Sequence, residues 1–343
     1  MLTVEWGEFY SLPLLKTLFA LVVVSLLAAA GYCGWYVATP VAVNKLPVEF
    51  EIASGMRLRG AAARIENAGI AIGRLQFEAL ARALGRAQDV KAGSYELTAA
   101  PTPLELLDKL TRGDVTQADV RFIEGWTFRQ MRAALDASPF VRHDGQGLGE
   151  AELLKKIGAS ESRSEGLFFP DTYLFSKGTS DLHVLRRAYQ AMQRHLAREW
   201  QARETSTPYK TPYDALIMAS IIEKETGRAA ERDMVAGALV NRLRLGMLLQ
   251  VDPTVIYGLG EAFDGNLKKN HLLTDGPYNT YTRAGLPPTP IAAPGLASLR
   301  AALHPAKTNA LYYVSRGDGT SEFSRSLDEH NSAVRKYQLK GRN

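Results

Sequence analysis

One stretch of this chain, residues 211–227, combines an almost wholly apolar helix with carboxylates at its end. Thr211 and Asp214 form the pattern of an N-terminal capping box, and Pro212 suits the first helical position. Gly227 is a helix stop signal. The apolar residues between these signals cover almost every face of a helix: Ala215, Leu216, Ile217, Met218, Ala219, Ile221 and Ile222. We therefore expect this helix to lie inside the core of a domain rather than on its surface.

Two carboxylates follow the apolar run directly. At about 100° per residue, Glu223 lies over Ala219 and Ser220. Glu225 lies on the opposite side of the helix. Burial raises the pKa of a carboxyl group, so a buried Glu can act as a general acid near neutral pH, and the small side chains at 219 and 220 would leave room for a ligand. The alternative is a solvated last turn in which both carboxylates pair with neighbouring cations: Lys224, Arg228 or Arg232.

An apolar segment lies near the N-terminus. Residues 17–44 contain no charged side chain, and residues 17–38 are long enough to span a bilayer. Aromatic residues gather at the C-terminal end of the segment, as at a membrane interface: Tyr32, Trp35 and Tyr36. A cleaved signal peptide usually has a shorter apolar region. We therefore expect a cytoplasmic head at 1–16, an uncleaved transmembrane helix at 17–38 and a linker at 39–46, although the few flanking charges do not by themselves set the orientation of the helix.

The composition excludes several classes of protein. The single cysteine, Cys33, lies in the predicted span, so the rest of the chain has no disulfide frame, cysteine zinc site or thiol nucleophile. The basic residues that give the net charge of +5 are dispersed, which does not indicate nucleic-acid binding. Phosphate-binding, dinucleotide, esterase and zinc-protease motifs are missing from the sequence, and its histidines lack ligand spacing. We expect no cofactor and no metal.

Two further segments follow the anchor. Residues 47–119 show the order strand, helix, helix, strand, with strands near 48–52 and 91–97 and helices near 61–67 and 75–84. This order resembles LysM-type modules, which commonly bind N-acetylglucosamine polymers, but a structural α/β spacer fits the same pattern. Residues 120–343 are rich in short Pro, Gly, Tyr and Asn strings. Aromatic faces beside amide side chains suit a sugar-binding groove, and a rigid surface loop is the alternative.

Several strings occur together in order: Ala219-Ser-Ile-Ile-Glu-Lys-Glu225, Leu249-Gln-Val-Asp-Pro-Thr-Val-Ile-Tyr257, Tyr278-Asn-Thr-Tyr281 and Gly285-Leu-Pro-Pro288. With them, nearly the whole chain resembles the membrane-anchored endolytic murein transglycosylases, the MltG or YceG-like family. The resulting prediction is an α+β protein. It would have an N-terminal transmembrane helix, a LysM-like βααβ module at 47–119 and an α+β catalytic domain at 120–343, with the acid on a buried helix.

The resemblance implies cleavage of the β-1,4 bond between N-acetylmuramic acid and N-acetylglucosamine in nascent peptidoglycan strands. The products would end in 1,6-anhydro-muramoyl residues, and the cleavage would limit glycan length. It also implies a single-pass protein of the inner membrane with its C-terminal part in the periplasm. Peptidoglycan strands, the membrane and penicillin-binding synthases would be its partners. The catalytic carboxylate of the family corresponds to Glu223, the first carboxylate of the S-I-x-E-K-E string.

A transglycosylase can work with one carboxylate. Glu223 would protonate the glycosidic oxygen and then accept the proton of the muramoyl C6 hydroxyl, which closes onto C1. We expect Glu225 and Ser220 to support the site from behind. The predicted substrate contacts are Gln250, Asp252, Tyr257, Tyr278, Asn279 and Tyr281, and three further residues could line the same groove: Glu165, Asp171 and Thr172.

One position departs from the family pattern, because Ser321 stands where the family usually carries a histidine. Two alternative functions stay open. A non-catalytic peptidoglycan-binding scaffold for cell-wall synthases would have no need of a buried acid. A hydrolytic muramidase would need a second carboxylate facing the acid, such as Asp252 or Glu165.

Overall fold

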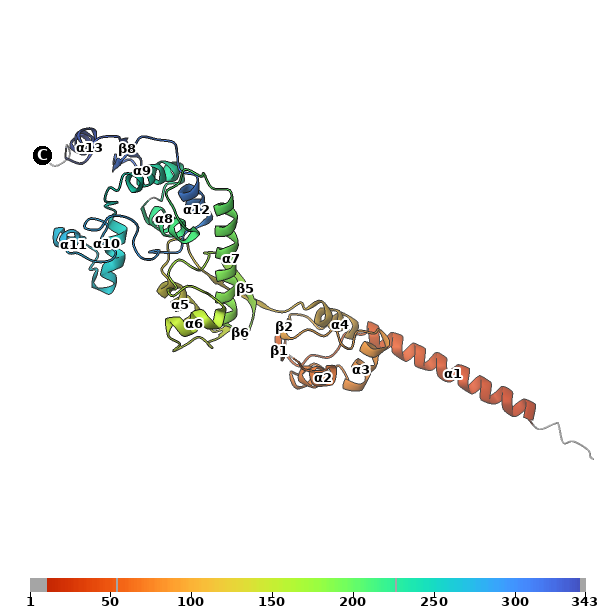
Figure 1. The fold of residues 1–343 in the computed structure, drawn as a ribbon. Coiled ribbons are helices and arrows are strands. Elements are labelled where there is room, and N and C mark those ends of the chain that lie inside the picture. Colours follow the sequence, from red (N-terminus) through yellow and green to blue (C-terminus); the bar gives the residue numbers. More distant parts are fainter. Residues whose placement is uncertain (1–10, 54, 226, 340–343) are drawn as a thin grey trace, which may run out of the picture. The chain divides into compact units, whose positions relative to one another are not determined.

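The computed structural model describes residues 11–53, 55–225 and 227–339 (Figure 1). The chain divides into two compact units. The first comprises residues 1–117 with 176–178, and the second comprises 118–175 with 179–343. Each unit has its own hydrophobic core.

The first unit begins with the long helix α1 (Ser11–Ala38). Its stretch Lys16–Ala38 is long and apolar enough to cross a membrane, and most of its side chains are exposed. This feature is compatible with a single-pass membrane anchor. The helix starts before the predicted span, since residues 11–16 already belong to it, whereas residues 1–10 of the predicted head lie outside the described residues.

The predicted order strand, helix, helix, strand is present after this helix. Strand β1 (Val48–Ile52) pairs antiparallel with β2 (Gly93–Leu97), and the Phe50 and Tyr95 rings stack with centroids 5.5 Å apart. Helices α2 (Leu58–Asn67) and α3 (Arg74–Ala83) lie between the strands in sequence, and α4 (Pro103–Arg112) follows them. The buried faces of these elements make the core of the first unit.

The second unit carries short strands and many helices. Strand β3 (Gln117–Arg121) pairs with β5 (Thr172–Ser176), and β4 (Val141–Arg142) pairs in parallel with β6 (Thr179–Ser180). Near the C-terminus, β7 (Tyr312–Ser315) and β8 (Ser321–Ser324) form an antiparallel hairpin. The helices are α5 (Phe128–Asp136), α6 (Glu150–Ile157), α7 (Asp181–Gln201), α8 (Pro212–Glu225), α9 (Arg232–Arg244), α10 (Asp252–Leu259), α11 (Lys269–Leu273), α12 (Leu296–Leu303) and α13 (Leu327–Val334).

Helix α8 lies inside this unit, as its composition predicts. Its residues Ala215–Ile222 are all buried, and it contacts α7, α9, α10 and α12 (Figure 1). The predicted capping box is present, because the Thr211 N–H donates to Asp214 Oδ2 at 3.0 Å and the Asp214 N–H donates to Thr211 Oγ1 at 3.2 Å. The helix ends at Glu225, so both carboxylates lie in its last turn.

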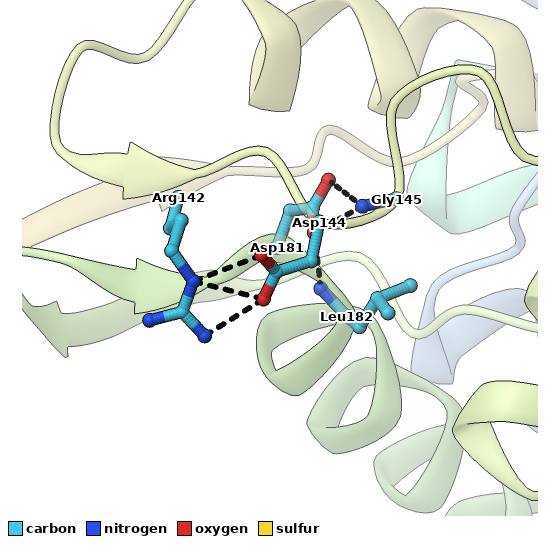
Figure 2. Close-up of polar contacts among 5 residues, drawn as sticks. All are labelled: Arg142, Asp144, Gly145, Asp181 and Leu182. Atoms are coloured by element: carbon cyan, nitrogen blue, oxygen red, sulfur yellow. Dashed lines mark hydrogen bonds and ion pairs between the residues drawn. The ribbon is translucent and has the colours of Figure 1, made fainter.

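A buried carboxylate fixes the start of the long helix α7. Asp181 is 1% exposed, and it accepts hydrogen bonds from the backbone N–H groups of Gly145 (2.9 Å) and Leu182 (2.7 Å) (Figure 2). A side chain at position 145 would collide with Asp181, since a Cβ there would lie 2.9 Å from Asp181 Oδ2. This contact holds the loop after β4 against the helix. Asp144 beside it forms an exposed ion pair with Arg142 (Figure 2).

We predict that Asp181→Ala lowers the free energy of unfolding by about 2 kcal/mol or more, because it leaves buried N–H groups without acceptors. Asp144→Ala is the matched control and should cost less, since exposed ion pairs add little stability. The midpoints of thermal unfolding, followed by circular dichroism, compare the two variants. Equal losses would contradict a structural role specific to Asp181.

Candidate active site

The two carboxylates of α8 have different surroundings. Glu225 is partly buried, and its Oε1 accepts a hydrogen bond of 2.9 Å from the Tyr313 hydroxyl of β7. Burial raises the pKa of Glu225, the Tyr313 hydrogen bond opposes this shift, and the charge of Asp252 adds to it. A carboxyl group whose protonated form is favoured in this way meets the requirement for a general acid.

Glu225 lines a groove of about 680 Å³, here called the Glu225 groove. Three predicted substrate contacts line it as well: Gln250, Asp252 and Tyr281. Aromatic, amide and carboxylate side chains on one concave surface match what a sugar-binding site needs. The structure therefore brings these three predicted residues together with the second carboxylate of the S-I-x-E-K-E string.

Gln250 holds a strained backbone conformation in this groove. Its φ of 54° lies in the left-handed region, which is unusual for a residue other than glycine. Arg242, which is 8% exposed, donates to Gln250 Oε1 at 3.1 Å and to the carbonyl oxygens of Leu248 and Leu249. Because Arg242 occupies the amide oxygen, the NH₂ group is the donor that Gln250 offers to a ligand.

Asp252 and Tyr281 are connected across the same groove. The Tyr281 hydroxyl donates to Asp252 Oδ1 at 2.5 Å. Burial first, and then the Asp252 carboxylate, raise the pKa of Tyr281, so the phenol keeps its proton. Asp252 is the first residue of α10, which places its carboxylate at the favourable end of the helix dipole.

Glu223 lies in a different environment. It is partly exposed, and its Oε2 accepts a hydrogen bond of 2.9 Å from the Gly295 N–H. The space expected above Ala219 and Ser220 is filled by the chain itself, because the Ile291 N–H donates to Ser220 Oγ at 3.0 Å. Ala219 and Ser220 are both fully buried, so they leave no open space at their own level of the helix. Burial and the Glu223 charge raise the pKa of the neighbouring Glu124.

The other predicted contacts lie outside the Glu225 groove. Tyr257 and Tyr278 meet edge to face, with ring centroids 4.9 Å apart, and line a second hollow of about 860 Å³. Asn279 is 3% exposed, and its amide donates to three backbone carbonyl oxygens: His271 at 3.2 Å, Leu272 at 3.1 Å and Thr274 at 2.7 Å. Asn279 therefore stabilises its loop, which differs from the contact predicted for it.

The second hollow contains a buried acid. Glu165 is 8% exposed, and it accepts hydrogen bonds from the Phe128 N–H at 3.0 Å and the Tyr257 hydroxyl at 3.1 Å. Burial raises the pKa of Glu165 to about 7, against the lowering effect of these two donors. Of the other residues named as possible lining, Asp171 and Thr172 are exposed and line neither hollow.

Sequence reasoning missed the C-terminal wall of the Glu225 groove. Tyr312 and Tyr313 of β7 line it with Ser321 and His330, and the Tyr312 and His330 rings stack at 5.2 Å. The departure at Ser321 thus falls in the groove, where the Ser321 N–H donates to Glu231 Oε1 at 2.9 Å. The adjacent tyrosines at 312 and 313 are the feature of the sequence that could have indicated this wall.

Among the described residues, no group of three or more His, Cys, Asp or Glu side chains could hold a metal ion.

A model of the YceG-like family matches residues 50–336. The chain belongs to the YceG-like family. A Bacillus subtilis (strain 168) relative named endolytic murein transglycosylase is 30% identical over 311 residues, which cover 86% of each protein. A Streptococcus pneumoniae (strain D39) relative of the same name is 26% identical, and the match covers 92% of this chain and 64% of the relative.

A crystal structure of another YceG-like protein, from Listeria monocytogenes, is similar as well. It shares 30% of its sequence with this chain at a TM-score of 0.52, and the match covers 83% of this chain and 98% of that chain. The mixed α+β architecture is therefore that of the family.

The raised pKa of Glu165 gives a pH-dependent stability. Its ordinary pKa is 4.5, so between pH 4.5 and 7 the unfolded chain binds fewer protons than the folded one, and the free energy of unfolding falls as the pH rises. We predict a loss of about 3 kcal/mol from this group across that range, and Glu165→Gln should abolish this part of the loss.

Urea unfolding at pH 4.5 and pH 7.5 measures this effect. The exposed carboxylate Glu152 of α6 offers a matched control, and Glu152→Gln should keep the wild-type pH dependence. An unchanged slope in Glu165→Gln would contradict the assignment.

Proposed function

We propose that this protein is an endolytic murein transglycosylase, which cleaves the β-1,4 bond between N-acetylmuramic acid and N-acetylglucosamine inside nascent glycan strands and leaves 1,6-anhydro-muramoyl ends. Its membership of the YceG-like family and the names of its relatives support this activity. The main structural support for the location of the active site is the Glu225 groove. In this groove an acid of raised pKa lies among amide, carboxylate and aromatic side chains.

We propose Glu225 rather than Glu223 as the general acid. The sequence pattern predicts Glu223, but Glu225 has two properties that the role requires: it lines a groove, and burial favours its protonated form. Glu223 instead accepts a hydrogen bond from the Gly295 N–H. In this proposal Glu223 supports the loop that ends at Gly295.

A single carboxyl group can perform both proton transfers of the reaction. Protonated Glu225 donates its proton to the glycosidic oxygen, the bond from that oxygen to the muramoyl C1 breaks, and positive charge develops at C1. The Glu225 carboxylate then accepts the proton of the muramoyl C6 hydroxyl, and O6 forms a bond to C1. No water is consumed, because the nucleophile is held on the same ring at a high effective molarity.

Three residues would hold the sugar for this step. The NH₂ group of Gln250, fixed by Arg242, can donate to a hydroxyl or acetamido oxygen. The Asp252 carboxylate, paired with the Tyr281 hydroxyl, can accept from a sugar hydroxyl. Tyr312 at the groove wall, whose ring packs against His330 and Arg242, can offer its hydroxyl group to a sugar hydroxyl.

A hydrolytic muramidase is the second candidate, because Asp252 is a second carboxylate in the same groove as Glu225. In that reaction one carboxylate would activate a water molecule or act as the nucleophile, and the products would be reducing ends instead of anhydro ends. The chemistry of the product end therefore separates the two reactions.

We also propose that α1 anchors the protein in the inner membrane with the part of the chain that follows α1 in the periplasm, and that penicillin-binding synthases are its partners. The apolar stretch Lys16–Ala38 supports the anchor. The β1-α2-α3-β2 order of the first unit supports a LysM-like role in holding glycan near the membrane.

Replacing each of the two carboxylates by an amide tests which of them is the general acid. We predict that Glu225→Gln lowers the rate of glycan cleavage by about 10²–10⁴-fold, the contribution typical of a general acid. Glu223→Gln should stay within about tenfold of wild type. Mass spectrometry of fragments from uncrosslinked peptidoglycan measures both the rate and the anhydro ends. The reverse ranking of the two variants would restore Glu223 as the acid.

Removal of the Tyr313 hydroxyl should change the pH profile. That hydrogen bond favours the Glu225 carboxylate, so Tyr313→Phe raises the pKa of Glu225 further. The protonated acid then persists to higher pH, and the high-pH fall of kcat/KM should shift upward. Tyr337→Phe, which removes a hydroxyl bonded to Glu322 Oε2, serves as the control. A shift of the same limb to lower pH would be inconsistent with Glu225 as the acid.

A further inference from the structure

The second hollow has a mixed lining that the proposed reaction does not use. Its walls include the apolar and aromatic side chains of Ile256, Tyr257, Tyr278 and Ile291. Its volume of about 860 Å³ exceeds that of the Glu225 groove. Pro253, Gly260 and the following polar and charged residues complete the lining: Thr127, Arg129, Gln130, Glu150, Arg163, Glu165, Lys224 and Thr289. A cavity of this kind suits a ligand that has both apolar and ionic groups.

Three cations and two carboxylates line the hollow, and Lys224 is the cation best able to meet an anionic group of a ligand. Lys224 donates to the Gly125 carbonyl oxygen at 3.3 Å, and the ion pairs within the described part of the chain give it no carboxylate. Arg163 pairs with Glu150, and the Arg side chain is 67% exposed, while Arg129 pairs with Glu261 on the surface. Exposed pairs of this kind are weak, so a ligand carboxylate can replace one partner.

The chemistry of peptidoglycan narrows the choice of ligand. Its glycan backbone carries acetamido and hydroxyl groups, which are neutral, and its carboxylates belong to the short peptides attached to the muramoyl lactyl groups. Cations beside an apolar wall therefore suit the peptide better than the sugar chain. Glu165, buried at the hollow, is a carboxyl group that can donate to a peptide carbonyl oxygen when protonated and accept from a peptide N–H when ionised.

The hollow and the Glu225 groove share a wall. Lys224 lines the hollow, and the next residue, Glu225, lines the groove. Asp252 lines the groove, and the next residue, Pro253, lines the hollow. The last turn of α8 and the first turn of α10 therefore contribute lining residues to both sites. A substituent of a sugar bound at Glu225 that extends past these turns would enter the hollow.

We propose that the second hollow binds the stem peptide of the muramoyl residue at the cleaved bond, with Lys224 contacting a peptide carboxylate. This inference rests on the proposed transglycosylase function and names the part of the substrate that the enzyme reads besides the sugar. The apolar wall contacts the peptide methyl groups, and Glu165 hydrogen-bonds the peptide backbone.

Matched glycans test the inference. The full chain in detergent is given uncrosslinked glycan strands with intact stem peptides or the same strands after an amidase has removed the peptides, and kcat/KM is measured for each. Wild type should favour the stem-bearing strands by at least about tenfold. Lys224→Gln should reduce this ratio at least about threefold through KM. Lys155→Gln, which removes an exposed cation of α6 outside the hollow, should keep the wild-type ratio.

The possible outcomes are distinct. Equal cleavage of both strands by wild type would overturn the inference and leave the proposed function intact. A Lys224→Gln variant that loses activity on both strands in the same proportion would assign Lys224 a structural role and also overturn the inference. Cleavage of neither strand by wild type would refute the proposed function and the inference with it.

Discussion

The burial of helix α8 is the constraint on which the site depends. Its residues Ala215–Ile222 are buried on every side, so close packing against α7, α9, α10 and α12, rather than one apolar face, fixes its position and rotation. The fixed helix in turn determines the directions in which the two carboxylates of its last turn point. Glu225 meets the Tyr313 hydroxyl of β7, and Glu223 meets the Gly295 N–H. One rigid element thereby places one carboxyl group in a groove and the other against a loop.

Local sequence signals predicted the elements of the fold well. The capping box at Thr211 and Asp214 marked the start of α8, and alternation at Val48–Ile52 marked β1. These signals act between residues close in sequence, so a single sequence contains them. The α2 helix begins at Leu58, three residues before its predicted start, since helix ends depend on the packing of flanking residues.

The division of the site residues between two hollows could not be predicted, because it depends on contacts between distant segments. Helical geometry predicts that Glu223 and Glu225 lie on opposite sides of α8. The residues of the helix itself do not indicate which side another segment of the chain covers. The bond from the Ile291 N–H to Ser220 Oγ decides this, and it joins residues 71 positions apart. Likewise, Asn279 fitted a sugar contact by type, yet three carbonyl oxygens of its own loop occupy its amide.

A structure of Glu225→Gln bound to an uncleaved glycan tetrasaccharide tests the central claim most directly. We expect the glycosidic oxygen of the central bond within hydrogen-bond distance of residue 225, with Gln250 and Asp252 contacting the flanking sugars. A glycan bound with its glycosidic oxygen beside Glu223, or bound along the second hollow with Glu165 next to that oxygen, would contradict the account.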